Sequence, residues 1–249
     1  MIEEYDELNS NLEQLGLLKV KENIGSYLDK NIFDNSQLIP FLNSLFSKEL
    51  AFRDERAREI NIFTSNFPYR KTIEDFDFDF QPGLSKKLIN DLMTLRFIEN
   101  SENIIFQGLP GTGKTMLATC IGTEAASKRI STYFISCAKL LSDLKKAKYE
   151  NRFERRLKQF CGYKLLIIDE LGFLPIEKEE ANLLFQLISA RYEKKPTIIT
   201  TNIEFSKWGE TLHDPLIASA ILDRLLHHCT VIQIDGPSYR TKDILNAQK

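Results

Sequence analysis

Gly108-Leu109-Pro110-Gly111-Thr112-Gly113-Lys114-Thr115 is the stretch that decides the fold of this 249-residue chain. It has the spacing G-x-x-x-x-G-K-T. An apolar, β-branched run at 103–107 precedes it, and 116–121 can continue as a helix. Strand, glycine-rich loop and helix is the context in which this spacing forms a phosphate-binding P-loop. Glycines let backbone N–H groups approach the phosphates at the helix N-terminus. Lys114 would contact the β- and γ-phosphates, and Thr115 would offer a hydroxyl to Mg²⁺.

Two carboxylates follow a second apolar strand, at 165–168. The carboxyl ends of neighbouring parallel strands meet at one edge of a sheet, so this strand end is expected beside the P-loop. Asp169 is then placed to hold Mg²⁺, directly or through water. Glu170 is placed to orient and deprotonate an attacking water, which favours hydrolysis of a nucleoside triphosphate over simple binding.

Two further polar residues are candidates for the same chemistry. Asn202 ends the apolar strand 197–200 and could hydrogen-bond the water or the γ-phosphate, although a polar strand end taken alone is usually a loop start. Arg224 lies in an apolar helical stretch. It could pair with Asp223 or Asp214, or serve as an arginine finger that reaches a neighbouring subunit's γ-phosphate, which requires an oligomer.

Composition places the chain among globular proteins and excludes several other classes. It is 43% hydrophobic and 27% charged, with a net charge of −2. We find no run of about 18 apolar residues, so no membrane association is expected. The N-terminus is acidic, which is wrong for a secretory signal. The four cysteines are widely spaced with no C-x-x-C pair, which fits a reduced, cytoplasmic protein without structural zinc.

The periodicity predicts a helical domain, a linker and an α/β domain. Residues 1–66 read as helical, with Leu8, Leu12 and Leu15 at helix spacing and a second helix capped at Asn35. Alternating aromatic and acidic residues suggest that the linker 67–83 is a strand-like segment. In the domain 84–249, a helix is expected at 85–98. Helices alternate with apolar strands after it, which predicts a mainly parallel sheet of five strands flanked by helices. The expected strands are 103–107, 131–135, 165–168, 197–200 and 231–234.

The charge is unevenly distributed along the chain. Residues 1–50 hold four Lys/Arg against nine Asp/Glu, whereas 128–164 hold eleven Lys/Arg against three Asp/Glu, a local net of +8. A solvated helix face is the usual explanation for such a run, but so few acids favour sequence-independent phosphate contacts to DNA. Arg53 and Arg56 share a helix face and have the same two interpretations. The candidate DNA contacts are Lys145, Lys146, Lys148, Arg152, Arg155, Arg156, Lys158, Arg53 and Arg56.

The histidines and the single tryptophan have simpler interpretations. Adjacent side chains point apart on a helix, so His227 and His228 are not expected to share a metal ion. We also find no third ligand at a metal-binding spacing in the sequence. Trp208 is expected to pack in the core.

Taken together, these motifs resemble an AAA+ ATPase, and more specifically the IstB family of insertion-sequence helper proteins. That family is related to the DnaC-type helicase loaders. The longer matching segments are 67–78, 169–175, 182–193 and 220–228. Gly236-Pro237-Ser238-Tyr239-Arg240 resembles the family's closing G-x-S-Y-R, which makes Arg240 a sensor 2-like residue. Met116, Thr201 and Leu109 depart from the family's usual residues without removing a contact. Nine residues follow Arg240, so the helical lid of larger AAA+ proteins is expected to be absent or vestigial.

The resemblance implies an ATP- and Mg²⁺-dependent ATPase that multimerises on duplex DNA, as a ring or helical assembly, and works with a transposase. It also implies that each ATP site is formed by residues of two neighbouring subunits. Nucleotide is held by Gly108, Pro110, Gly111, Thr112, Gly113, Lys114, Thr115, Asp169 and Arg240, and catalysis uses Glu170, Asn202 and, from the next subunit, Arg224. A replicative helicase loader and a non-hydrolysing DNA-binding scaffold are the alternatives, and a small-molecule kinase is less favoured because no acceptor-binding lid is evident.

Overall fold

The computed structural model describes residues 2–28 and 35–241. The chain separates into two compact units, Met1–Ile60 and Asn61–Lys249, which are described in turn. The sequence pattern predicts the boundary between the helical domain and the linker after residue 66. Among the described residues, no helix is both long and apolar enough to cross a bilayer.

The first unit is helical, as the leucine spacing predicts. It contains α1 (Ile2–Gln14), α2 (Leu18–Leu28) and most of α3 (Asn35–Thr64), which continues past the end of the unit. Its small core comprises Leu8, Leu12, Ile24 and Ile39. The predicted start at Asn35 is confirmed, and the helix runs as far as Thr64.

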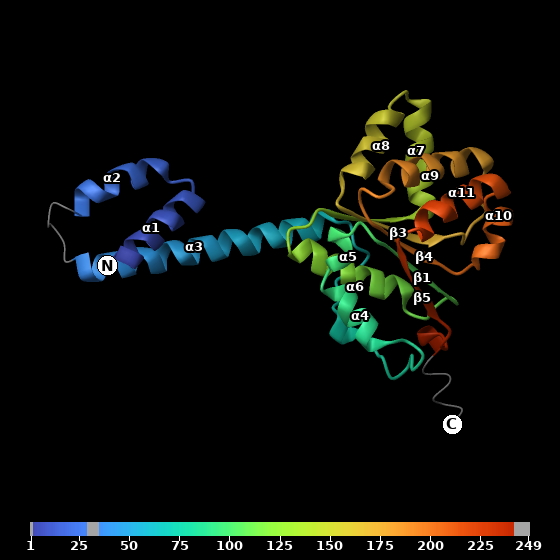
Figure 1. Cartoon of the computed structure of the whole chain (residues 1–249), viewed down its shortest axis with the longest axis horizontal. Helices are drawn as coiled ribbons and strands as arrows, with labels where there is room; N and C mark the ends of the chain where they lie inside the picture. The colour runs from blue at the N-terminus through green and yellow to red at the C-terminus, as the bar shows by residue number, and fades with distance from the viewer. Residues whose placement is uncertain (1, 29–34, 242–249) are drawn as a thin grey trace. The chain divides into compact units, whose positions relative to one another are not determined.

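The second unit is built on a five-stranded sheet in which every neighbouring pair is parallel. The strand order is β2-β3-β4-β1-β5 (Figure 1). The five predicted strands are confirmed, each with at least one end shifted by a residue or more. Their bounds are β1 (Asn103–Gly108), β2 (Thr132–Ser136), β3 (Leu165–Leu171), β4 (Thr197–Thr201) and β5 (Cys229–Ile234).

Helices cover both faces of this sheet, so side chains on each strand alternate between two cores (Figure 1). Ile104 and Phe106 pack under α4 (Lys86–Met93), α5 (Arg96–Glu99) and α6 (Lys114–Ser127), whereas Ile105 faces the other side. The helices on that other side are α7 (Cys137–Tyr149), α8 (Phe153–Gly162), α9 (Lys178–Arg191), α10 (Trp208–Thr211) and α11 (Pro215–Leu226). Trp208 is fully buried there, which confirms its packing role.

Two local predictions were wrong. Segment 67–83 contains turns and a short 3₁₀ helix, η1 (Ile73–Asp75), in place of a strand. Phe76 points into the core, while Asp75 and Asp77 accept hydrogen bonds from the backbone N–H groups of Thr72 and Phe80. The helix expected at 85–98 is broken by Leu95, which has φ of +69° and separates α4 from α5.

Candidate functional site

The P-loop joins the carboxyl end of β1 to the first turn of α6, as its sequence context predicts. Gly113 caps α6 with φ of +98°, and a Cβ atom there would lie 2.6 Å from Cε2 of Phe76. A Cβ atom on Gly108 would lie 2.2 Å from the carbonyl oxygen of Ile234. These glycines therefore permit both the turn and its close packing against neighbouring segments.

Lys114 is drawn into the loop that precedes it. Its ammonium group donates hydrogen bonds of 2.7 Å to the carbonyl oxygens of Gly108 and Leu109. The residue is only 9% exposed. Burial lowers the pKa of Lys114, and the nearby Asp169 carboxylate opposes that shift. The loop thus holds one cation at the helix N-terminus, which is the arrangement that binds phosphate.

A hydrogen-bonded chain connects the P-loop to β3 and β4. Thr115 Oγ1 donates to Asp169 Oδ1 at 2.9 Å, and Thr200 Oγ1 donates to the same oxygen at 2.5 Å. The backbone N–H of Glu170 donates in turn to Thr200 Oγ1 at 2.9 Å. Thr115 and Asp169 lie together as expected, and their hard oxygen donors fit Mg²⁺. Thr200 was missed because a threonine inside a buried strand reads as an ordinary β-former.

The Glu170 side chain lies just beyond these hydrogen bonds, where the pairing of β3 is irregular. The φ of Glu170 is +59°, and the pairing of β3 with β4 shifts between Ile168 and Leu171. The Glu170 side chain is exposed while that of Asp169 is buried. The two adjacent carboxylates therefore have different surroundings: one is fixed by hydroxyls and the other is open to solvent.

A cavity of about 350 Å³ opens beside the P-loop. Arg240 lines it, as expected for a residue that contacts nucleotide, and so do residues 111–116. Tyr69, Phe76 and Gln81 form another wall. Segment 67–83 is therefore part of the candidate site, and the sequence interpretation as a linker missed this role. Burial raises the pKa of the Tyr69 hydroxyl.

The segment after β5 closes this cavity through two hydrogen bonds. Gln81 Nε2 donates to the carbonyl oxygen of Pro237 at 2.8 Å, and the N–H of Tyr239 donates to the carbonyl oxygen of Gly111 at 2.8 Å. These bonds bring the short 3₁₀ helix η3 (Tyr239–Thr241), which carries Arg240, against the P-loop.

Asn202 and Arg224 do not line this cavity. Asn202 follows β4, and its Oδ1 is buried with no hydrogen-bond partner in the described residues. Arg224 lies on α11, donates to the carbonyl oxygen of Ala220 at 2.9 Å and stacks over Phe185 at 4.9 Å. Within residues 2–28 and 35–241 it forms no ion pair, so of its two interpretations the pairing with Asp223 or Asp214 is not seen.

Several of the basic residues predicted to contact DNA are ion-paired. Lys145 contacts Glu177 at 2.5 Å and Lys148 contacts Glu179 at 2.7 Å, so acids at the start of α9 neutralise these two lysines. In the first unit, Arg53 pairs with Glu49 at 2.7 Å. These three fit the solvated, ion-paired interpretation, whereas Arg56 has no ion pair among the described side chains.

Four of the five remaining basic residues gather around a cavity of about 310 Å³ between α7 and α8. Its lining includes Lys146, Arg152, Arg155 and Arg156, with Asp143 as the one acid. Arg156 pairs with Asp143 at 2.6 Å and Arg152 pairs with Glu150. Lys146 and Arg155 form no ion pair within the described part of the chain, so these two cations are available to an anionic partner.

The geometric argument against a shared contact of His227 and His228 was wrong. Helix α11 ends at Leu226, so the two residues leave the helix and their ring centroids lie 4.1 Å apart. A third donor, Glu193, lies beside them. Local sequence could not show this contact, because Glu193 precedes β4 and is brought close only by the sheet.

Comparison with known proteins agrees with this architecture. The chain is 50% identical over 239 residues to an insertion sequence IS232 protein from Bacillus thuringiensis subsp. berliner that is named as ATP-binding, covering 96% of both chains. It is 41% identical to the corresponding IS21 protein from Pseudomonas aeruginosa, covering 95% of this chain and 89% of that one.

Two solved structures share the fold. AMPPCP-bound DnaA from Aquifex aeolicus has a TM-score of 0.58 at 18% identity, covering 73% of this chain and 55% of that one. The DnaC helicase loader has a TM-score of 0.53 at 23% identity, covering 70% and 98% respectively. The sequence profile of the IstB-like ATP binding proteins matches residues 10–247. The chain therefore belongs to the family of IstB-like ATP binding proteins.

Proposed function

We propose that this protein binds ATP with Mg²⁺ in the cavity beside the P-loop and hydrolyses it. The observation that carries the proposal is the bonded chain from Thr115 through Asp169 and Thr200 to Glu170. It joins a phosphate-binding loop to the backbone of Glu170, whose carboxylate faces solvent one residue beyond the carboxylate proposed to hold the metal. A site that only bound nucleotide would not need the second carboxylate.

The chain's own residues divide the work. Lys114 and the N–H groups at the start of α6 hold the β- and γ-phosphates, and Arg240 lies on the cavity wall to contact the nucleotide. Thr115 and Asp169 would hold Mg²⁺, which neutralises charge on the phosphate oxygens. Glu170 accepts a proton from the attacking water, and Asn202, whose Oδ1 lacks a partner among the described residues, helps to position that water.

Arg224 is assigned to the site of a neighbouring subunit. It lies on α11 and is absent from the lining of its own P-loop cavity. An arginine that contacts the γ-phosphate from a neighbour stabilises charge in the transition state. This assignment makes each site incomplete without a second copy of the chain, and therefore couples ATP binding to assembly.

Duplex DNA is the proposed surface on which copies assemble. Lys146 and Arg155 have no ion pair among the described residues, and they lie with Arg152 and Arg156 around one cavity. Such a cluster would bind phosphates without reading bases, and its affinity would fall steeply with salt. The proposed biological partner is the transposase of an insertion sequence, because the relatives at 50% and 41% identity both belong to insertion sequences. The likeness to the DnaC helicase loader, at 23% identity, concerns the fold alone.

Hydrolysis is tested by ATP turnover with and without duplex DNA. Glu170→Gln should abolish turnover, keep ATP binding and prolong the ATP-dependent assembly on DNA. Glu210→Gln, which changes an exposed carboxylate on α10, is the matched control and should behave as wild type. Turnover at background level in the wild type, unchanged by DNA, would support a non-hydrolysing scaffold instead.

The role of Arg224 is tested by mixing two inactive variants. Lys114→Ala removes the phosphate contact of its own site but leaves Arg224 to serve a neighbour, whereas Arg224→Ala does the reverse. If the arginine acts between subunits, each variant alone is inactive and the mixture recovers part of the turnover. Full turnover by Arg224→Ala alone, or no recovery on mixing, would refute the assignment.

A further inference from the structure

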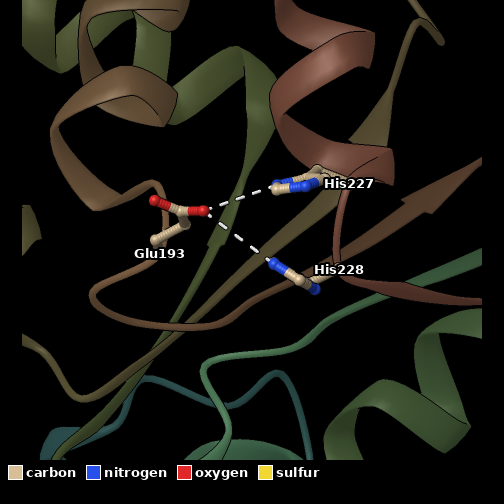
Figure 2. Close-up of side chains that lie close together, drawn as sticks. All are labelled: Glu193, His227 and His228. Carbon is tan, nitrogen blue, oxygen red and sulfur yellow. Dashed lines mark ion pairs between the residues drawn. The ribbon is translucent and has the colours of Figure 1, made fainter.

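A second cluster of ligating side chains lies at the amino ends of the strands, whereas the P-loop lies at their carboxyl ends. Glu193 precedes β4, and His227 and His228 precede β5 (Figure 2). Glu193 Oε1 is 3.5 Å from His227 Nδ1 and 3.9 Å from His228 Nε2. The three ligating atoms all lie within 4.8 Å of one another. In Figure 2 both imidazole rings face the same carboxylate.

The surrounding backbone fixes the positions of these residues. Glu193 has φ of +56° in the turn after α9, and that turn is closed by bonds from the N–H groups of Lys194 and Lys195 to the carbonyl oxygen of Arg191. His227 is the C-cap of α11. The carbonyl oxygen of His228 accepts a 2.8 Å hydrogen bond from the N–H of Asn103, at the start of β1. The backbone of Glu193 is therefore held by a closed turn, that of His227 by the end of α11 and that of His228 by the start of β1.

The donor set selects a class of metal. Two imidazole nitrogens with one carboxylate oxygen suit zinc and other divalent first-row transition metals, whereas Mg²⁺ and Ca²⁺ prefer oxygen donors alone. With Zn–N and Zn–O bonds of about 2.0–2.2 Å, donors around a tetrahedral ion lie roughly 3.3–3.5 Å apart. The Glu193 oxygen lies 3.5 Å from His227 Nδ1, already within that range, and its 3.9 Å separation from His228 Nε2 needs only a small side-chain rotation.

Tyr192 lies beside two of the ligands. Its hydroxyl is 2.7 Å from His227 Nδ1, so an ion bound at that nitrogen would displace this contact. The hydroxyl also faces Glu193, and a hydrogen bond to that carboxylate would orient it as outer hydrogen bonds do at metal sites. The nearest cation along α11, Arg224, is engaged with Ala220 and Phe185 rather than with Glu193, so the carboxylate has no lysine or arginine partner among the described residues.

We propose that Glu193, His227 and His228 form a binding site for a divalent transition metal ion such as Zn²⁺, open to solvent on one side and separate from the ATP site. A bound ion would tie the C-terminal end of α11 to the turn between α9 and β4. It would thereby stabilise the position of α11, the helix that carries Arg224.

The test uses the full chain without a polyhistidine tag, with Zn²⁺ alone as the probe. Zinc is titrated against a chromophoric chelator in excess Mg²⁺, so that Thr115 and Asp169 do not compete for zinc. The wild type should take up one ion per chain. Glu193→Gln and His228→Ala should each weaken binding by more than about tenfold, since even outer-contact changes cost about 10–100-fold. Their side chains are exposed, and circular dichroism would check that both variants fold.

The chain contains three histidines, and the third provides the matched control. His213 is exposed and lies outside the cluster, so His213→Ala should bind zinc as the wild type does. Cys229→Ser, next to His228, should also retain binding. As an independent measure, zinc should raise the thermal midpoint of the wild type and leave that of Glu193→Gln unchanged. Absence of zinc binding in the wild type would mean that the cluster is an ion pair only. Equal affinity in Glu193→Gln and the wild type, or binding lost with Cys229→Ser, would also overturn the site.

Discussion

Thr200 is the residue whose replacement tests the site most directly. Its hydroxyl donates to Asp169 Oδ1 and accepts from the N–H of Glu170. Valine has nearly the same shape, so Thr200→Val removes both bonds without opening a cavity. A hydrogen bond to a charged group contributes about 1.5–3 kcal/mol, and a buried donor left without a partner costs about 1–3 kcal/mol. Because such values are not additive, we expect the free energy of unfolding to fall by about 2–4 kcal/mol.

Urea unfolding measures this loss through the fluorescence of Trp208, which is the single tryptophan and is fully buried. With an m-value of about 2–3 kcal/mol/M, the midpoint should shift by roughly 1 M. Turnover per folded molecule should also fall by about ten- to a hundredfold, because Glu170 loses the bond that fixes its backbone beside the reacting water.

Thr201→Val is the matched control on the next position of β4. Thr201 is equally buried, donates to the carbonyl oxygen of Leu171 at 2.8 Å and accepts from the N–H of Ile203 at 3.2 Å. It touches neither carboxylate. Thr201→Val should lose about 1–2 kcal/mol of stability and retain turnover. Equal turnover in Thr200→Val and wild type, measured where both are folded, would refute the positioning role.

Three other changes test the framework. Arg191 is 2% exposed, and its guanidinium group donates to Thr197 Oγ1 and to three backbone carbonyl oxygens. A lysine cannot make all of these hydrogen bonds, so Arg191→Lys should lower the unfolding free energy measured by urea unfolding by about 2–4 kcal/mol. Gly113→Ala adds a Cβ 2.6 Å from Phe76 at φ of +98°, so calorimetry should show loss of ATP binding, and wild-type affinity would contradict the loop geometry. Backbone N–H groups of α11 and then Lys178 lower the pKa of Asp214. The contribution of Asp214 to stability is therefore full above its unfolded pKa, near 3.8, and is lost as pH falls below that value. The urea unfolding midpoint of Asp214→Asn should consequently fall less between pH 5 and 3 than that of the wild type.

Local sequence predicted the strands and the P-loop well, for a physical reason. Runs such as Leu165–Ile168 are apolar and continuous because both faces of a parallel sheet are covered, and that pattern needs no knowledge of neighbours. The meeting of Thr115 with Asp169 was also predictable, because the carboxyl ends of parallel strands share an edge. In these cases a local motif and the parallel topology together were enough to predict which residues meet.

The parts that could not be predicted depend on contacts between distant segments. The alternating aromatic and acidic residues around Phe76 predicted a strand. Phe76 is instead buried because it packs against Gly113. Leu95 breaks a helix although leucine is a good helix former, so packing outweighs propensity there. Glu193 reaches His228 only because β4 and β5 flank β1. No periodicity within either segment encodes these pairings.

The sheet also offers a direct route between the proposed ATP and DNA sites. Ser136, the last residue of β2, pairs in register with Asp169 on β3 and accepts a hydrogen bond from the N–H of Lys139 as the N-cap of α7. The first turn of α7 therefore begins beside the backbone of Asp169, whose carboxylate is proposed to hold Mg²⁺, and Lys146 lies further along the same helix. A rearrangement of Asp169 and Glu170 on hydrolysis would act at the start of α7 without crossing a flexible loop. We therefore propose that a change in nucleotide state would alter the placement of the basic cavity, so that release from DNA would follow from loss of geometry and not from loss of charge.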